Sequence, residues 1–349
     1  MSSVTEAKPA APASLPAELA DKLRPHHFLV AAFLLAYPLI ASDFWIVQIG
    51  AQTFFLGLIG LSLMLLAGYG GMVSLAQLAI AGLAGYMYAI LGENSASLGL
   101  GWPWWVVIPL ALAIAVAFAT IVGTLSVRTE GIYTIMITLA MSVALFYFCQ
   151  QNYSIFNGFK GYAGLAPPHV FGVDWRGPMP FYYLALGVGA GGYFGVLWLS
   201  RSTFGIALQA TRDNPRRMAA LGYNVRAHRI ATYAVAGLLA GLGGLFLVWF
   251  NGRISPGTIN VGNAINILVI AILGGLRRPI GPFIGALIFV LLDNFAIDLI
   301  DRDRFNLVIG GAFLAVVLFS PDGVLGLWDG LKRRMAKTAA ERGKDMRIR

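Results

Sequence analysis

The chain has 349 residues, of which 12% are charged and 58% are hydrophobic. A soluble globular protein carries about 25% charged residues, so this composition excludes an ordinary soluble enzyme and a disordered protein. Its single cysteine, Cys149, excludes a disulfide-stapled domain, and we expect it to be a small buried hydrophobe. The net charge of +9 comes from bases at the ends of apolar runs, which indicates membrane topology rather than nucleic-acid binding. The expected fold class is all-α, a polytopic bundle of transmembrane helices.

Ten apolar segments follow one another along the chain, and about 20 mostly apolar residues are enough for one membrane span. Residues 1–27 precede them as a polar, flexible cytoplasmic tail, and residues 328–349 follow as a basic cytoplasmic tail. The transmembrane domain is therefore expected at 28–327. The first and eighth segments are short enough to be broken or re-entrant. The ten segments are 28–41, 43–69, 71–91, 103–127, 131–150, 180–199, 229–250, 264–276, 279–298 and 305–320.

The distribution of lysine and arginine predicts the orientation of these segments. With the N-terminus inside, 20 of the 25 bases fall on the inner side and 5 on the outer side. Cytoplasmic loops are enriched in lysine and arginine, so the chain is expected to have both termini in the cytoplasm. On this topology, residues 200–229 form the longest internal cytoplasmic loop.

A helix break is expected where the third segment begins. Three of the four residues 68–71 are glycine, and Ser74 and Gln77 follow one helical turn apart between small residues. Polar groups in lipid must find partners or face a water-filled path. Two interpretations stay open. Ser74 and Gln77 face a translocation path that Tyr86 narrows, or they hold helices together by hydrogen bonds.

The loop at 200–229 carries the start and stop signals of an ordered short helix. Asn214 is a good N-cap, and Pro215 suits the first helical position. Gly222 ends the helix, and arginines form a basic rim. We therefore expect a structured docking element rather than a linker.

The sequence lacks the residues that several kinds of function require. No phosphate-binding loop occurs, so we expect no ATPase activity, and no metal or cofactor set is present. Asp293 is the one acid well inside a predicted span, and such acids are functional suspects. The scarcity of acidic residues inside the predicted spans disfavours a self-contained secondary carrier, which stays the alternative. The broken helices disfavour a membrane scaffold that transports nothing. Small residues four apart are expected to pack helices together, at 187/191/195, 237/241 and 281/285.

Four stretches resemble the LivM-type permease subunit of ABC importers for branched-chain amino acids, and the similarity runs from about Leu56 to Leu327. Where the family usually has Gly-His, this chain has Ala76-Gln77. This local sequence is closer to that of the partner permease subunit, LivH. The four stretches are 68–77 with 84–86, 128–140, 202–205 with 212–214 and 219–222, and 273–276 with 280–282 and 285–286.

The resemblance implies a multi-pass permease of the bacterial inner membrane. Its partners would be a second, LivH-like permease subunit, two ATPase subunits that use the ATP, and a periplasmic binding protein. Its substrate would be a branched-chain or other hydrophobic or neutral amino acid, while relatives are believed to carry urea, amides or aromatic acids. The loop at 205–224 resembles the coupling helix that docks on an ATPase. The residues carried over to that role are Gly205, Arg212, Asp213, Asn214, Arg216, Ala219 and Gly222.

Overall fold

The computed structural model describes residues 25–94, 99–168, 172, 174–299, 310, 311, 314 and 323–326. The predicted tails at 1–27 and 328–349 and the tenth segment lie almost wholly outside the described residues. The other nine predicted apolar segments all overlap helices, although residues 71–76 of the third segment are not helical. The elements are α2 (Pro25–Ile40), η1 (Trp45–Ala51), α3 (Gln52–Met64), η2 (Leu65–Tyr69), α4 (Gln77–Leu91), α5 (Trp104–Ser126), α6 (Ile132–Gln151), α7 (Tyr153–Phe156), β1 (Tyr162–Ala163), α8 (Pro178–Arg201), α9 (Thr203–Asp213), α10 (Pro215–Ala220), α11 (Val225–Asn251), β2 (Arg253–Ile254), η3 (Pro256–Ile259), α12 (Val261–Gly274) and α13 (Gly281–Leu299).

The described part of the chain is mostly helical, as the composition predicts. Five of its helices are long and apolar enough to cross a membrane, and η1, α3 and η2 together form the first of them. Helices α4, α12 and α13 are apolar but shorter. The fold class is therefore confirmed as a helical multi-pass membrane protein, while the ten-span count stays a prediction.

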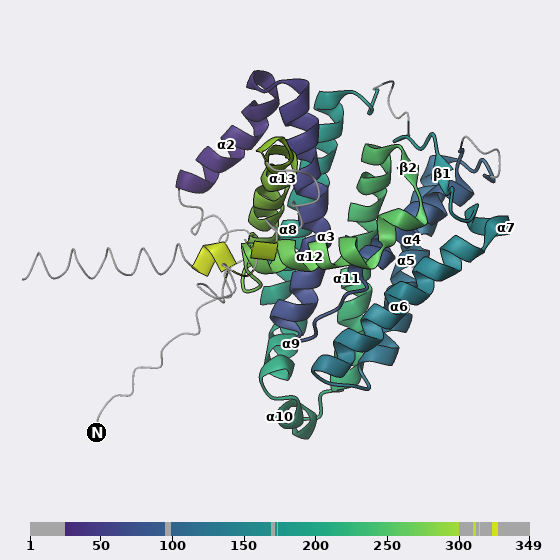
Figure 1. Ribbon diagram of the computed structural model, residues 1–349. Coiled ribbons are helices and arrows are strands. Elements are labelled where there is room, and N and C mark those ends of the chain that lie inside the picture. The colour runs from purple at the N-terminus through teal and green to yellow at the C-terminus, as the bar shows by residue number, and fades with distance from the viewer. Residues whose placement is uncertain are drawn as a thin grey trace, which may run out of the picture.

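Helices α3, α4 and α11 form the buried centre, and α5, α6 and α8 surround it with apolar faces exposed (Figure 1). A Cβ atom on Gly237 would meet the Cβ of Ala119 on α5, so the predicted small-residue packing of α11 is confirmed. Gly281 and Gly285 likewise approach the backbone of α12. The stripe at 187/191/195 on α8 differs, because nothing lies within 4 Å of those glycines.

The predicted inner loops meet at one end of the molecule, and two predicted outer loops meet at the other. Glu130 lies 3.9 Å from Arg229, and helices α9 and α10 project at the same end (Figure 1). At the opposite end β1 pairs antiparallel with β2, with Tyr162 opposite Ile254. Cys149 is fully buried, as predicted. Asp293 lies on α13 with intermediate exposure.

Candidate functional site

The chain leaves the helical conformation between η2 and α4, where the glycine-rich run predicts a break. The Met72 amide donates to the Leu66 carbonyl (2.9 Å), and Gly71 has a φ of +69° that favours glycine. Helix α4 therefore begins at Gln77 rather than at the predicted residue 71. Its 15 residues span about 22 Å, short of a hydrocarbon core of about 30 Å. Helix α4 alone is therefore too short to cross the bilayer.

Ser74 lies in this break and Gln77 is the first residue of α4, and both are buried. The Ser62 hydroxyl on α3 donates to Gln77 Oε1 (2.9 Å), and Gln77 Nε2 donates to Ser74 Oγ (3.4 Å). Ser74 Oγ also accepts from the Ala76 amide (3.3 Å). The polar groups of the break therefore bond to one another and to α3. We call residues 70–77 with Ser62 the buried joint.

A polar helix face that was missed from the sequence lies against the buried joint. Thr134, Thr138 and Ser142 on α6 are buried, while the exposed side of α6 carries large apolar residues. Thr138 Oγ1 accepts from the Leu75 amide (3.1 Å), and Ser142 Oγ has no partner among the described residues. A helix that turns its polar side inward is typical of one that lines a polar region in a membrane. The spacing of four residues between these polar side chains is the signal in the sequence that indicates one polar helix face.

The structure does not bring Tyr86 to Ser74 and Gln77. Tyr86 lies nine residues beyond Gln77, which is about 13 Å along α4. It is buried in a separate apolar cluster with Cys149 and Phe156, whose ring it meets edge-on with centroids 5.2 Å apart. Its hydroxyl has no partner within the described residues. Tyr86 thus belongs to the end of the molecule that carries β1 and β2.

The predicted docking loop is folded as two short helices, and their ends follow the sequence signals. Asn214 caps α10 by accepting from the Arg217 amide (2.9 Å), and Pro215 is its first residue. At its other end the Gly222 amide donates to the Ala219 carbonyl (3.0 Å), with a φ of +88° at Gly222. The Tyr223 amide closes the turn on the Met218 carbonyl (3.1 Å), which completes a Schellman motif. Of the seven predicted coupling residues, all except the buried Gly205 are exposed.

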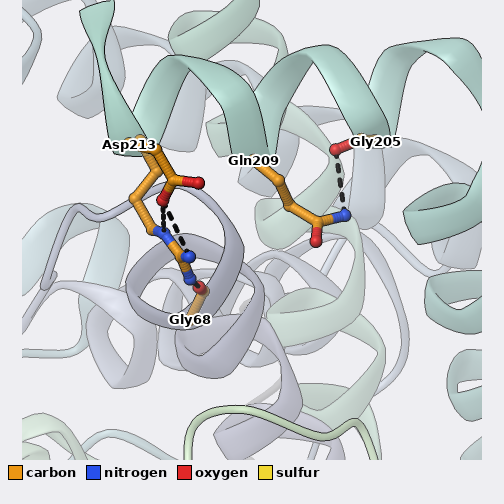
Figure 2. A network of polar contacts seen from close by, with 5 residues as sticks. Gly68, Gly205, Gln209 and Asp213 are labelled. Atoms are coloured by element: carbon orange, nitrogen blue, oxygen red, sulfur yellow. Dashed lines mark hydrogen bonds and ion pairs between the residues drawn. The ribbon is translucent and has the colours of Figure 1, made fainter.

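Helix α9 folds tightly back on the end of α8. A Cβ on Gly205 would meet the Leu199 carbonyl oxygen and the Ser200 Cα, so no larger residue fits this turn. Ser202 caps α9 by accepting from the Gly205 amide (3.2 Å). Gln209 Nε2 donates to the carbonyls of Ser200 (3.1 Å) and Gly205 (3.2 Å), the second of which Figure 2 shows. These contacts fix the direction of α9 relative to α8.

Arg212 is exposed, as expected of the predicted basic rim, but its guanidinium also contacts another helix. Its Nε and Nη2 atoms donate to Asp213 Oδ1 (3.0 and 2.9 Å), and Nη1 donates to the Gly68 carbonyl (Figure 2). Arg212 thus connects α9 to the end of η2. Sequence reasoning also missed an aromatic contact. The His228 ring stacks on Phe204 with centroids 5.0 Å apart and meets Tyr223 edge-on, which ties α9 and the turn after α10 to the start of α11.

Comparison with known proteins places this arrangement among membrane transport proteins. Residues 45–318 match the family described as "Branched-chain amino acid transport system / permease component". The high-affinity branched-chain amino acid permease protein LivM of Escherichia coli K12 is 24% identical over 336 residues, covering 89% of this chain and 77% of that protein. A probable LivH permease of Methanocaldococcus jannaschii is 31% identical over 40% of this chain and 46% of its own length. The ribose import permease RbsC of Haemophilus influenzae is 25% identical over 69% of this chain and 76% of its own length. No solved structure matches the chain.

Proposed function

Because the chain belongs to the family of branched-chain amino acid transport permease components, we propose that it carries a branched-chain or other hydrophobic, neutral amino acid. It is a permease component of an ABC importer and not an ATP-hydrolysing subunit. The low number of charged side chains in the predicted spans also agrees with such a substrate, because a path for a neutral zwitterion needs few of them. The alternative substrates are urea, short amides and aromatic acids.

We propose that the permease spans the bacterial inner membrane ten times, with both termini in the cytoplasm. The excess of lysine and arginine in the predicted inner loops supports this orientation. A reporter that is active only in the cytoplasm, fused after Arg349, should be active in whole cells. An inactive reporter on a full-length, inserted chain would contradict the orientation.

The partners that we propose are a LivH-like second permease subunit, two ATPase subunits and a periplasmic binding protein. The single observation that carries the proposal is the α9–α10 element, which is capped at both ends and presents exposed arginines outside the apolar bundle. A preformed surface of this kind binds with little loss of conformational entropy. We propose that α10 and the Gly222 turn contact the ATPase, with Arg216 and Ala219 on the contact surface. Gly205, Arg212, Asp213 and Asn214 shape this element.

The substrate path that we propose passes the buried joint. Ser74 and Gln77 would face it, together with the polar side of α6, and Tyr86 would narrow it farther along α4. In a closed conformation the polar groups of such a path satisfy one another, as Ser62, Ser74 and Gln77 do. The rival interpretation is that these bonds only hold α3 and α4 together.

Gly222→Asp tests the docking proposal. A side chain at Gly222 would strain the left-handed turn, although nothing lies within 4 Å of its Cβ position. We expect the variant to insert normally but to lose the ATPase subunits on co-purification and to lose uptake. Gly101→Asp is the matched control, because Gly101 also has a positive φ (+63°) and open space but lies between α4 and α5, away from α10. Normal ATPase binding by an inserted Gly222→Asp chain would contradict the proposal.

A further inference from the structure

Arg212 connects the α9–α10 element to the buried joint, two regions that are far apart in the sequence. Its guanidinium bonds to Asp213 on one side and to the Gly68 carbonyl on the other, 144 residues away along the chain (Figure 2). The Arg212 side chain is 41% exposed, while Asp213 is 67% exposed. An arginine that served as a free docking contact would not be engaged on both sides in this way.

Gly68 is an effective anchor because it lies where the helix Trp45–Tyr69 ends. The last carbonyls of a helix have no partner within it and carry partial negative charge, so a cation there is stabilising. The stem of Arg212 also lies against the chain just beyond that end, since a Cβ on Gly71 would lie 2.6 Å from Arg212 Cγ. Arg212 therefore contacts the chain on both sides of the point where the helix stops.

We infer that Arg212 is a positioning residue that transmits movement of α9 to the buried joint, rather than a contact to the ATPase. The inference rests on the proposed function, because only a docked ATPase would move α9. Gly205 and Gln209 hold α9 on the end of α8, so the two move together and carry Arg212 with them. Arg212 would then displace Gly68.

The chain between Gly68 and Gln77 is short and mostly non-helical, so a displacement at Gly68 reaches Gln77 directly. Gln77 is the residue that bonds the joint to Ser62 on α3. Movement of Gly68 would therefore change the bonds at Gln77, which lie beside the polar side of α6. This chain of contacts gives the ATP-driven motion a physical route to the proposed path.

Arg212→Lys is the sharpest test, because it keeps the charge but replaces the planar fork by a single ammonium group. A lysine cannot hold the carboxylate and the carbonyl in the same fixed geometry. The matched control is Arg226→Lys, at an exposed position whose side chain makes no hydrogen bond or ion pair among the described residues. Both variants are studied in the complete complex with its second permease, ATPases and binding protein, reconstituted in liposomes.

The measured quantity is the ratio of ATP hydrolysis with substrate-loaded binding protein to hydrolysis without it. For Arg212→Lys we expect the ATPase subunits to co-purify in normal proportion and this ratio to fall roughly tenfold, as for loss of a hydrogen bond to a charged group. Arg226→Lys should keep the ratio. A purely structural role would lower both rates together and leave the ratio unchanged, and that result would overturn the inference.

Two other results would also overturn it, namely an unchanged ratio at full activity or loss of the ATPase subunits from Arg212→Lys. If the Arg212→Lys chain does not fold and insert into the membrane, Asp213→Asn replaces it, because this change keeps the side-chain shape and weakens only the bonds that hold the Arg212 guanidinium. A normal ratio for Asp213→Asn would then contradict the inference. The docking proposal is judged separately, since it fails only if Gly222→Asp keeps its ATPase subunits.

Discussion

The buried joint and the α9–α10 element use polar side chains in opposite ways. In the α9–α10 element, the side-chain oxygens of Ser202 and Asn214 accept hydrogen bonds from backbone amides three residues away. Each helix start is therefore fixed locally. In the joint, Gln77 and Leu75 depend on Ser62 and Thr138, which belong to other helices. The helix ends of the element are therefore fixed by local bonds, whereas the bonds of the joint change when helices move. This difference fits the docking surface and the substrate path that we propose for these two regions.

The largest effect is expected from Gly205→Ala, which would break the support of the α9–α10 element. The added Cβ would meet the Leu199 carbonyl, so α8 and α9 must separate at a cost of about 1–3 kcal/mol. We expect loss of both ATPase binding and uptake. Gly187→Ala, on the open side of α8, is the matched control and should leave the chain's melting temperature unchanged. Wild-type ATPase binding by Gly205→Ala would mean that the direction of α9 is unimportant.

A smaller effect on stability is expected from Gln77→Leu, which separates the two interpretations of the buried joint. The Ser62 hydroxyl can still donate to the Ile59 carbonyl (2.6 Å), and Ser74 still accepts from the Ala76 amide. No polar group loses every partner, so the free energy of unfolding should fall by only about 1 kcal/mol while uptake is lost.

The control for this change is Gln52→Leu, because Gln52 Oε1 has no partner among the described residues. That variant should keep its stability and transport. If Gln77→Leu fails to assemble, or if it transports normally, Gln77 only packs helices together and the path interpretation is wrong.

The smallest effect is expected from Asn214→Ala, which removes the N-cap of α10. Loss of such a cap costs about 1 kcal/mol, and here the cost is confined to a helix of six residues. We expect faster amide hydrogen exchange over residues 214–222 and a reduced affinity for the ATPase subunits, with the melting temperature of the bundle unchanged. Asn152→Ala removes a similar cap at α7, at the other end of the molecule, and should leave ATPase binding intact. Unchanged exchange over 214–222 would show that the tertiary contacts alone hold α10.

Features set by neighbouring residues could be predicted from the sequence, and features set by distant residues could not. Asn214, Pro215 and Gly222 give the limits of α10 because capping acts within three or four residues. The glycines at 68–71 likewise predict the break. The contact between Arg212 and Gly68 depends on how two distant helix ends meet, and a basic residue in a loop gives no sign of such a partner.

The candidate path shows the same limit. Ser74 and Gln77 stand out in the sequence because they are polar in an apolar run, but the bond of Gln77 to Ser62 depends on the packing of α3 against α4. Tyr86 was grouped with them by sequence proximity, and the length of α4 separates it from them. Thr134, Thr138 and Ser142 were within reach of the sequence, because their spacing of four residues marks one face of a helix.

A comparison of ATP-driven uptake with uptake driven by an ion gradient tests the central claim most directly. Liposomes would hold this chain either alone or with its partner permease and ATPases, and labelled leucine would be supplied with the binding protein outside. We predict accumulation only in the complete complex with ATP and Mg²⁺ inside, and none by the chain alone under a proton or sodium gradient. Accumulation by the chain alone under either gradient would contradict the account and show a self-contained carrier.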